Sequence, residues 1–246
     1  IDGLWEALEA NVVPDLEIMD PLSGEPFIQK DLYKLIELTS RVNPHCRWNF
    51  TTNGQWEFTD YIKSHLDMIE IDLISISVDT VNHQTYESIR AGGELQNLKR
   101  NIVKLMEYVS EREKLKGKRI RLVLNFTIQK NNAYEIEEMF SYCEQVGLAP
   151  LFLFLYDPSD LSLEGWSDDQ KAGYLHFYFN KLNKSQLIVT NRLFMAVIRS
   201  IEDKSIKTKW YKFYEFVTDE DICKITEASM DPLSYALNRS QEISSF

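Results

Sequence analysis

The stretch Ile71-Asp72-Leu73-Ile74-Ser75-Ile76-Ser77-Val78, followed by Asp79, carries the clearest structural signal in the chain. From Ile74 onward, branched apolar residues alternate with polar ones, which is the period-two pattern of a β-strand. The two faces then hold different sets, namely Ile74, Ile76 and Val78 on one and Ser75, Ser77 and Asp79 on the other. The sequence therefore predicts a strand with one apolar face and one face that ends in polar groups.

Four more strands are expected along the chain, at residues 16–20, 48–52, 119–128 and 150–156. Segments with helical periodicity separate them, at residues 30–41, 58–65, 95–112 and 134–146, and another helix is expected at 2–11. This alternation predicts right-handed crossovers and a parallel sheet, hence the α/β class. Five units favour a barrel or partial barrel over a small open sheet. The strand at 150–156 is apolar throughout, so burial on both faces is expected.

The strand–helix rhythm changes after Asp157. Residues 168–200 have a helical pattern, and residues 205–246 are mixed and rich in aromatic side chains. We predict two domains: a partial α/β barrel over 1–157 and a mainly helical C-terminal extension, or cap, over 158–246. The aromatic segment 210–216 is expected to be core, with a substrate wall or partner surface as the alternative.

Composition narrows the function classes. With 27 basic and 38 acidic residues the net charge is −11, which argues against a broad nucleic-acid-binding surface but leaves a local basic patch open. No apolar run approaches the about 18 residues of a membrane span, and no signal peptide is visible. The three cysteines lack metal-ligand spacing, and Cys143 is expected in the core. We therefore expect a reduced, cytoplasmic setting with no membrane partner.

Polar side chains recur at the ends of three strands. Asn49, Thr51 and Asn53 alternate with apolar residues in the second strand, and Asn125, Thr127 and Gln129 do so in the fourth. Because outer helices must cover the apolar faces, the polar sets are expected to face inward, where parallel α/β folds place ligands. The turn Ser23-Gly24-Glu25-Pro26 adds a carboxylate on a rigid backbone. Together these features predict a polar small-molecule site.

At this point the sequence resembles the radical S-adenosylmethionine (radical SAM) superfamily, most closely members with SPASM- or twitch-type C-terminal extensions. The resemblance covers about residues 1–157 and rests on short motifs in the family's order. They are Ser23-Gly24-Glu25-Pro26, Thr52-Asn53-Gly54, Ser77-Val78-Asp79 with Tyr86-Glu87-Ser88-Ile89-Arg90, Gly92-Gly93 with Asn101-Ile102, and Asn125-Phe126-Thr127 with Asn132 and Glu135-Ile136. The resemblance implies a (β/α)6-type barrel that lacks its first strand.

The resemblance also implies roles for individual residues. Glu25, on the Ser23–Pro26 turn, would bind the amino group of the methionine moiety of S-adenosylmethionine (SAM). Ser77 and Asp79 would contact the ribose or carboxylate, and Arg90 would pair with the carboxylate. Thr52 and Asn53 belong to the same cofactor-binding set. Asn125 and Thr127 would line the pocket, and Leu153 and Leu155 would contact adenine.

The chain departs from the family pattern at two points. Ser23 replaces the first glycine of the family's G-G-E-P turn, which is a mild change. The C-x-x-x-C-x-x-C motif that holds the [4Fe–4S] cluster is absent from this sequence. We expect its ligands upstream of Ile1 in a longer natural protein, because the chain opens inside a predicted helix. The chain alone is then expected to be inactive.

The resemblance predicts an enzyme in which the reduced cluster cleaves SAM to a 5′-deoxyadenosyl radical. A peptide or protein substrate is the leading interpretation, with sugar or nucleoside modification left open, and a reductant such as flavodoxin or ferredoxin is implied. One alternative is a degenerate barrel that binds SAM, a peptide or a nucleotide without redox chemistry. Another is an unrelated α/β-barrel hydrolase or lyase built on Asp20, Asp79 and Asp157. His83, expected in the loop after the third strand, is a lesser candidate for substrate contact.

Overall fold

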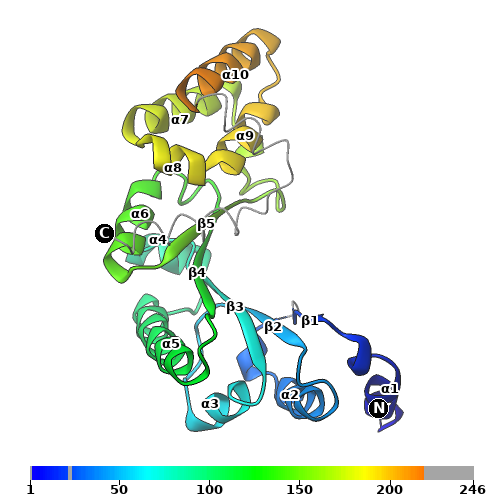
Figure 1. Cartoon of the computed structure of the whole chain (residues 1–246). Coiled ribbons are helices and arrows are strands. Elements are labelled where there is room, and N and C mark those ends of the chain that lie inside the picture. Colours follow the sequence, from blue (N-terminus) through cyan, green and yellow to red (C-terminus); the bar gives the residue numbers. More distant parts are fainter. Residues whose placement is uncertain (1, 22–23, 219–246) are drawn as a thin grey trace. The chain divides into compact units, whose positions relative to one another are not determined.

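The computed structural model describes residues 2–21 and 24–218, and Figure 1 shows its elements. Five strands form one sheet in chain order: β1 (Ile18–Met19), β2 (Arg47–Thr52), β3 (Glu70–Ser77), β4 (Arg121–Ile128) and β5 (Ala149–Phe154). The β1–β2 and β2–β3 pairs are parallel. The predicted α/β class with a parallel sheet is therefore confirmed.

Helices precede, separate and follow these strands. They are α1 (Asp2–Asn11), α2 (Lys30–Val42), α3 (Asp60–Leu66), α4 (His83–Ile89), α5 (Leu95–Lys116), α6 (Ile136–Val146), α7 (Asp168–Lys181), α8 (Lys184–Val189), α9 (Asn191–Ser200) and α10 (Lys204–Thr218). Short 3-10 turns lie at η1 (Val13–Asp15), η2 (Pro26–Ile28) and η3 (Leu163–Gly165). No helix within the described residues is long and apolar enough to cross a membrane.

Three predictions about these elements were wrong. The first strand is only two residues long, and η1 ends at Asp15, shortly before the strand begins. Helix α4 was not predicted, so His83 is its first residue rather than part of a loop. Strand β5 is not buried on both faces: Phe152 is buried but Leu153 is 39% exposed. An apolar run by itself does not reveal which of its faces is covered.

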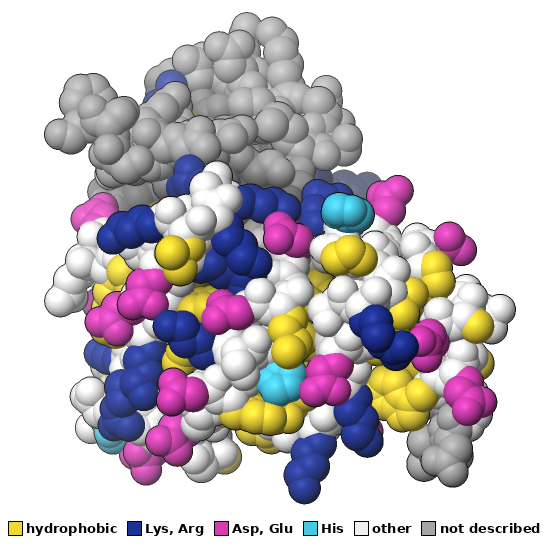
Figure 2. Space-filling view, turned by 60° about the horizontal axis from the view of Figure 1, so that its bottom comes forward, with side chains coloured by type: hydrophobic (Ala, Val, Ile, Leu, Met, Phe, Trp, Pro, Cys, Tyr) yellow, Lys and Arg dark blue, Asp and Glu magenta, His cyan; other side chains and the backbone are white. Residues whose placement is uncertain are grey.

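The chain divides into two compact units, and each is described by itself. The first unit holds residues 1–77 and 92–123, and the second holds residues 78–91 and 124–246. The predicted domain boundary after residue 157 stays a prediction. On the face drawn in Figure 2, acidic and basic side chains lie interspersed with apolar ones.

In the first unit, α2, α3 and α5 lie on one side of β2 and β3 (Figure 1). The apolar sets that alternate along β2 and β3 are fully buried, including Trp48, Phe50, Ile74 and Ile76. In β2 the polar residues between them, such as Thr51, keep partial exposure, which confirms the predicted apolar and polar faces of that strand. In β3 the polar Ser75 is itself buried.

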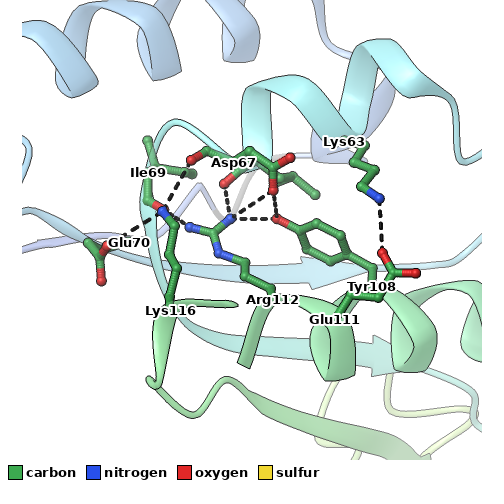
Figure 3. A network of polar contacts seen from close by, with 9 residues as sticks. Lys63, Asp67, Ile69, Glu70, Tyr108, Glu111, Arg112 and Lys116 are labelled. Atoms are coloured by element: carbon green, nitrogen blue, oxygen red, sulfur yellow. Dashed lines mark hydrogen bonds and ion pairs between the residues drawn. The ribbon is translucent and has the colours of Figure 1, made fainter. Parts of the chain in front are cut away.

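Hydrogen bonds from Arg112 link α5 to the segment that joins α3 to β3 (Figure 3). Its side chain is 5% exposed and donates to the carbonyls of Leu66 and Ile69 and to the Tyr108 hydroxyl. Asp67 lies 3.6 Å from Arg112 Nη1 and accepts a hydrogen bond from the Tyr108 hydroxyl at 3.1 Å. This buried cation is satisfied by carbonyls and one carboxylate, which is the condition for burying a charge without a large cost.

In the second unit, helices α7 to α10 pack against one another (Figure 1). Trp210 of α10 stacks on Phe179 of α7 with ring centroids 5.8 Å apart. Trp210 and Tyr214 are buried, which confirms the core interpretation for these two aromatic residues, while Phe213 is 40% exposed. Cys143 is buried in α6, as predicted.

Candidate functional site

Glu25 is fixed on the turn before η2. Gly24 has a φ of +73°, which glycine adopts without steric cost, and Pro26 begins the 3-10 turn that Glu25 caps. The Glu25 side chain is buried and points at the end of β2. Its Oε1 accepts from the Thr52 hydroxyl at 2.7 Å, and its Oε2 accepts from the Asn53 backbone N–H at 2.7 Å. The Gly-Glu-Pro segment and the Thr-Asn-Gly turn are thus joined through the carboxylate of Glu25, 27 residues before Thr52.

The turn that receives Glu25 is held by two residues that sequence reasoning did not assign to the site. The Trp56 indole N–H donates to the Thr52 hydroxyl oxygen at 2.7 Å. Asn101, on α5, donates through its side chain to the carbonyls of Gly54, at 2.8 Å, and Trp56. The signal for Asn101 was a polar residue on the apolar face of a helix, which usually has a buried partner.

Gly54 is required at this turn for two separate reasons. Its φ is +68°, a left-handed conformation that costs other residues free energy. A Cβ atom at this position would also lie 2.6 Å from Cδ1 of Leu98, which is fully buried. The α5 helix therefore packs directly against the backbone of the Thr-Asn-Gly turn.

The Tyr33 hydroxyl lies beside the Glu25 turn and donates to the Phe27 carbonyl at 2.5 Å. Burial, with smaller contributions from the nearby Tyr61 and the negative charge of Glu25, raises the pKa of Tyr33 to about 12. Tyr33 is thus neutral near pH 7 and acts as a hydrogen-bond donor at the base of this turn.

In the second unit, Asp79 forms a second polar cluster just beyond the end of β3. Its φ is +60°, an uncommon conformation for a residue with a side chain, and functional sites are enriched in such residues. Its Oδ1 accepts from the Thr127 N–H at 2.9 Å, and its Oδ2 accepts from Nε and Nη2 of Arg90, the former at 2.8 Å. Two N–H groups of Arg90 therefore converge on one carboxylate oxygen of Asp79 in a charge-assisted ion pair.

Asn125 brings an unsatisfied acceptor to this second cluster. Its backbone carbonyl accepts from the N–H groups of Val78 and Asp79, at 2.8 and 3.3 Å. Its side chain is buried, and within the described residues its Oδ1 atom has no hydrogen-bond partner. A buried amide oxygen without a partner fits a ligand that donates an N–H or O–H group there.

The other predicted site residues are placed as follows. Ser77 is the half-buried last residue of β3, in the first unit. Leu155 follows β5, and its N–H donates to the Ile128 carbonyl at 3.1 Å. His83 is exposed, and its Nδ1 lies 3.7 Å from Glu87. Ser23 and Cys223 lie outside the described residues.

A metal centre is not formed by the part of the chain that the structure describes, where no three His, Cys, Asp or Glu side chains come together. Cys46 and Cys143 are buried free thiols, and burial raises the pKa of both. High-pKa buried thiols are poor metal ligands because the thiolate is the ligating form. His65 is buried and contacts the Tyr61 carbonyl and Glu37, so it is a structural residue.

Comparison with solved structures finds proteins of similar fold. The fold is similar to that of anSMEcpe, solved with bound AdoMet and the Kp18Cys peptide, with a TM-score of 0.50 and 15% identity. The similarity covers 73% of this chain and 51% of that one. No family model matches the chain.

Comparison of the amino-acid sequence with curated proteins finds relatives over half of the chain. The chain is 25% identical over 124 residues to a probable GTP 3′,8-cyclase of Methanococcus maripaludis strain C5, and 26% identical to that of strain C6. Each similarity covers 50% of this chain, which spans only 38% of the relative's length. These likenesses confirm the predicted resemblance to the radical SAM superfamily.

Proposed function

We propose that this chain is the SAM-binding part of a radical SAM enzyme. The observation that carries the proposal is the junction of two family-like turns, in which the Glu25 carboxylate binds Thr52 and Asn53. A buried carboxylate held on rigid backbone is suited to an ammonium group. The structure is also consistent with the partial (β/α)6-type barrel and helical C-terminal extension that the resemblance implies, and these remain part of the proposal.

The two polar clusters are assigned separate contacts. In the first unit, Glu25 takes the amino group of SAM. In the second unit, the unsatisfied Asn125 oxygen accepts from a ribose hydroxyl or an adenine amine. Because Arg90 already binds Asp79, we assign the carboxylate contact to the remaining N–H groups of the Arg90 guanidinium. Ser77 in the first unit, and Thr127 and Leu155 in the second, keep the SAM contacts that the resemblance implies as part of the proposal.

The [4Fe–4S] cluster is part of the proposal, although its ligands are not among the described residues. When bound to a reduced [4Fe–4S] cluster, SAM supplies a 5′-deoxyadenosyl radical, and cluster ligation needs converging thiolates. The described residues do not fit that cluster. We therefore propose that cysteines upstream of residue 1 hold it, with a flavodoxin or ferredoxin as reductant. The chain alone then binds SAM without cleaving it.

A peptide is the proposed substrate class, supported by the fold similarity to anSMEcpe, which was solved with a peptide. A nucleotide is the second candidate, supported by the sequence similarity to probable GTP 3′,8-cyclases. Competition between a radiolabelled nucleotide and a cysteine- or serine-containing peptide for the SAM-bound protein would separate these two classes.

Calorimetric titration of the purified chain with SAM tests the proposal. We expect saturable binding that Glu25→Gln weakens about 10- to 150-fold, since one charged contact is worth roughly 1.5–3 kcal/mol. Asn125→Ala should weaken it as well, because the ligand loses an acceptor. The matched control is Glu87→Gln, an exposed glutamate of α4. Absence of binding at millimolar SAM, or equal affinity in the Glu25 and Glu87 variants, would contradict the proposal.

A further inference from the structure

Glu135 joins two threonines of a segment 50 residues earlier in the chain. Its Oε2 accepts from the Thr80 hydroxyl, and its Oε1 accepts from the Thr85 hydroxyl at 2.5 Å. Thr80 lies directly after Asp79, and Thr85 is in the first turn of α4. One carboxylate therefore holds both the residue that follows Asp79 and the beginning of the next helix.

Asn132 holds the same segment from its other side. Its side-chain N–H donates to the carbonyls of Asp79, at 2.8 Å, and Thr127, at 3.0 Å. Its Oδ1 accepts from the Gln129 N–H at 2.8 Å, so the whole amide is satisfied. Asn132 is fully buried. The left-handed backbone of Asp79 is thus fixed by contacts from the segment after β4.

Arg90 lies at the opposite end of helix α4 from the contact with Glu135. The helix has only seven residues, too few to be stable alone, so its orientation depends on what holds its ends. Arg90 is its C-cap residue and donates its backbone N–H to the Tyr86 carbonyl. Glu135 acts at the first turn of α4, and the Arg90–Asp79 pair lies at the other end. The negative charge of Glu135 also suits the N-terminal end of a helix.

We propose that Glu135 is a positioning residue that orients α4 so that the Arg90 guanidinium binds Asp79 and presents its remaining N–H groups to an anionic group of the ligand. The ligand part of this inference rests on the proposed SAM-binding function, whereas the positioning part does not. Without Glu135, both threonine hydroxyls lose their acceptor, and α4 is no longer fixed at its first turn. The Arg90–Asp79 geometry then loosens even though neither residue has changed.

The test combines NMR of the Arg90 side chain with calorimetry. The Arg90 Nε–H resonance is assigned by its loss in Arg90→Lys, and it reports the hydrogen bond to Asp79. In Glu135→Ala we expect this resonance to shift and exchange faster, and the affinity for SAM to fall about tenfold. Thr85→Val should act in the same direction, and the double variant should lose less than the product of the two single losses. Glu135→Gln, whose amide can face both hydroxyls, should restore most of both readouts.

Glu137→Ala is the matched control, because this glutamate lies two residues after Glu135, in the first turn of α6, but its partner is the exposed Lys181. It should leave the Arg90 resonance and the affinity unchanged. An unchanged Arg90 resonance in Glu135→Ala, or an equal change in Glu137→Ala, overturns the inference. If the unaltered protein binds no SAM, the proposed function fails and the Arg90 resonance alone decides the positioning role. If Glu135→Ala does not fold, Thr85→Val gives the same readouts, and an unchanged Arg90 resonance in Thr85→Val then overturns the inference.

Discussion

Replacing Gly54 by alanine should destabilise the protein far more than replacing Gly117, although both glycines have left-handed backbones. Their φ values are +68° and +66°, so the cost of forcing alanine into this conformation is the same at both, about 1–2 kcal/mol. The difference comes from the space available for the new Cβ atom. The new Cβ at position 54 would lie 2.6 Å from Leu98 Cδ1, whereas nothing lies within 4 Å at position 117.

The contact at position 54 cannot be relieved cheaply. Carbon atoms in contact normally lie about 3.5–4.0 Å apart, so Leu98 must move by roughly 1 Å. Leu98 is fully buried, and forcing a packed side chain aside costs about 1–3 kcal/mol. The total for Gly54→Ala is then about 2–5 kcal/mol, against about 1–2 kcal/mol for Gly117→Ala.

Urea unfolding followed by tryptophan fluorescence and by circular dichroism measures both losses on the same scale. Gly54→Ala should also weaken SAM binding, because strain at position 54 acts on the turn that carries Asn53, which donates to Glu25. Gly117 caps the far end of α5, so its variant should bind SAM normally. Equal loss of unfolding free energy in the two variants would refute the packing argument.

Three further predictions concern single side chains. Since the pKa of Tyr33 is raised to about 12, its stabilising contribution is complete below about pH 10 and is lost as the pH rises toward 12. The loss, about 3 kcal/mol at most, should be absent in Tyr33→Phe when unfolding is measured across this range. Arg112→Ala should cost about 3–5 kcal/mol, because two buried carbonyls and Asp67 lose their partner. Arg41→Ala, which breaks an exposed pair with Glu9, should cost less than about 1 kcal/mol in the same melts. Trp56→Phe keeps an aromatic ring but removes the indole N–H donor and part of a buried side chain, so it should cost at least about 1 kcal/mol and weaken SAM binding in calorimetry. An unchanged affinity would mean that the turn is held without the indole N–H.

Local patterns were sufficient for most elements of the fold. The alternation in β3 and the helical spacing in α5 are properties of neighbouring residues, so they were readable from the chain itself. Helix α4 was not, because its first turn is held by Glu135, about 50 residues further along the chain. The partial exposure of β5 was missed for a similar reason: which face of an apolar strand is covered depends on distant elements.

For the candidate site too, some features could be predicted from the sequence and others only from the tertiary structure. The amino-acid sequence determined which turns carry polar residues, and their order was enough to reveal the resemblance to the radical SAM superfamily. Only the tertiary structure showed that Glu25 is bound by Thr52 and Asn53, and that Asp79 and Arg90 bind each other. The physical reason is that a carboxylate or guanidinium takes its partners from whatever the fold brings within about 3 Å, and sequence spacing does not encode that distance.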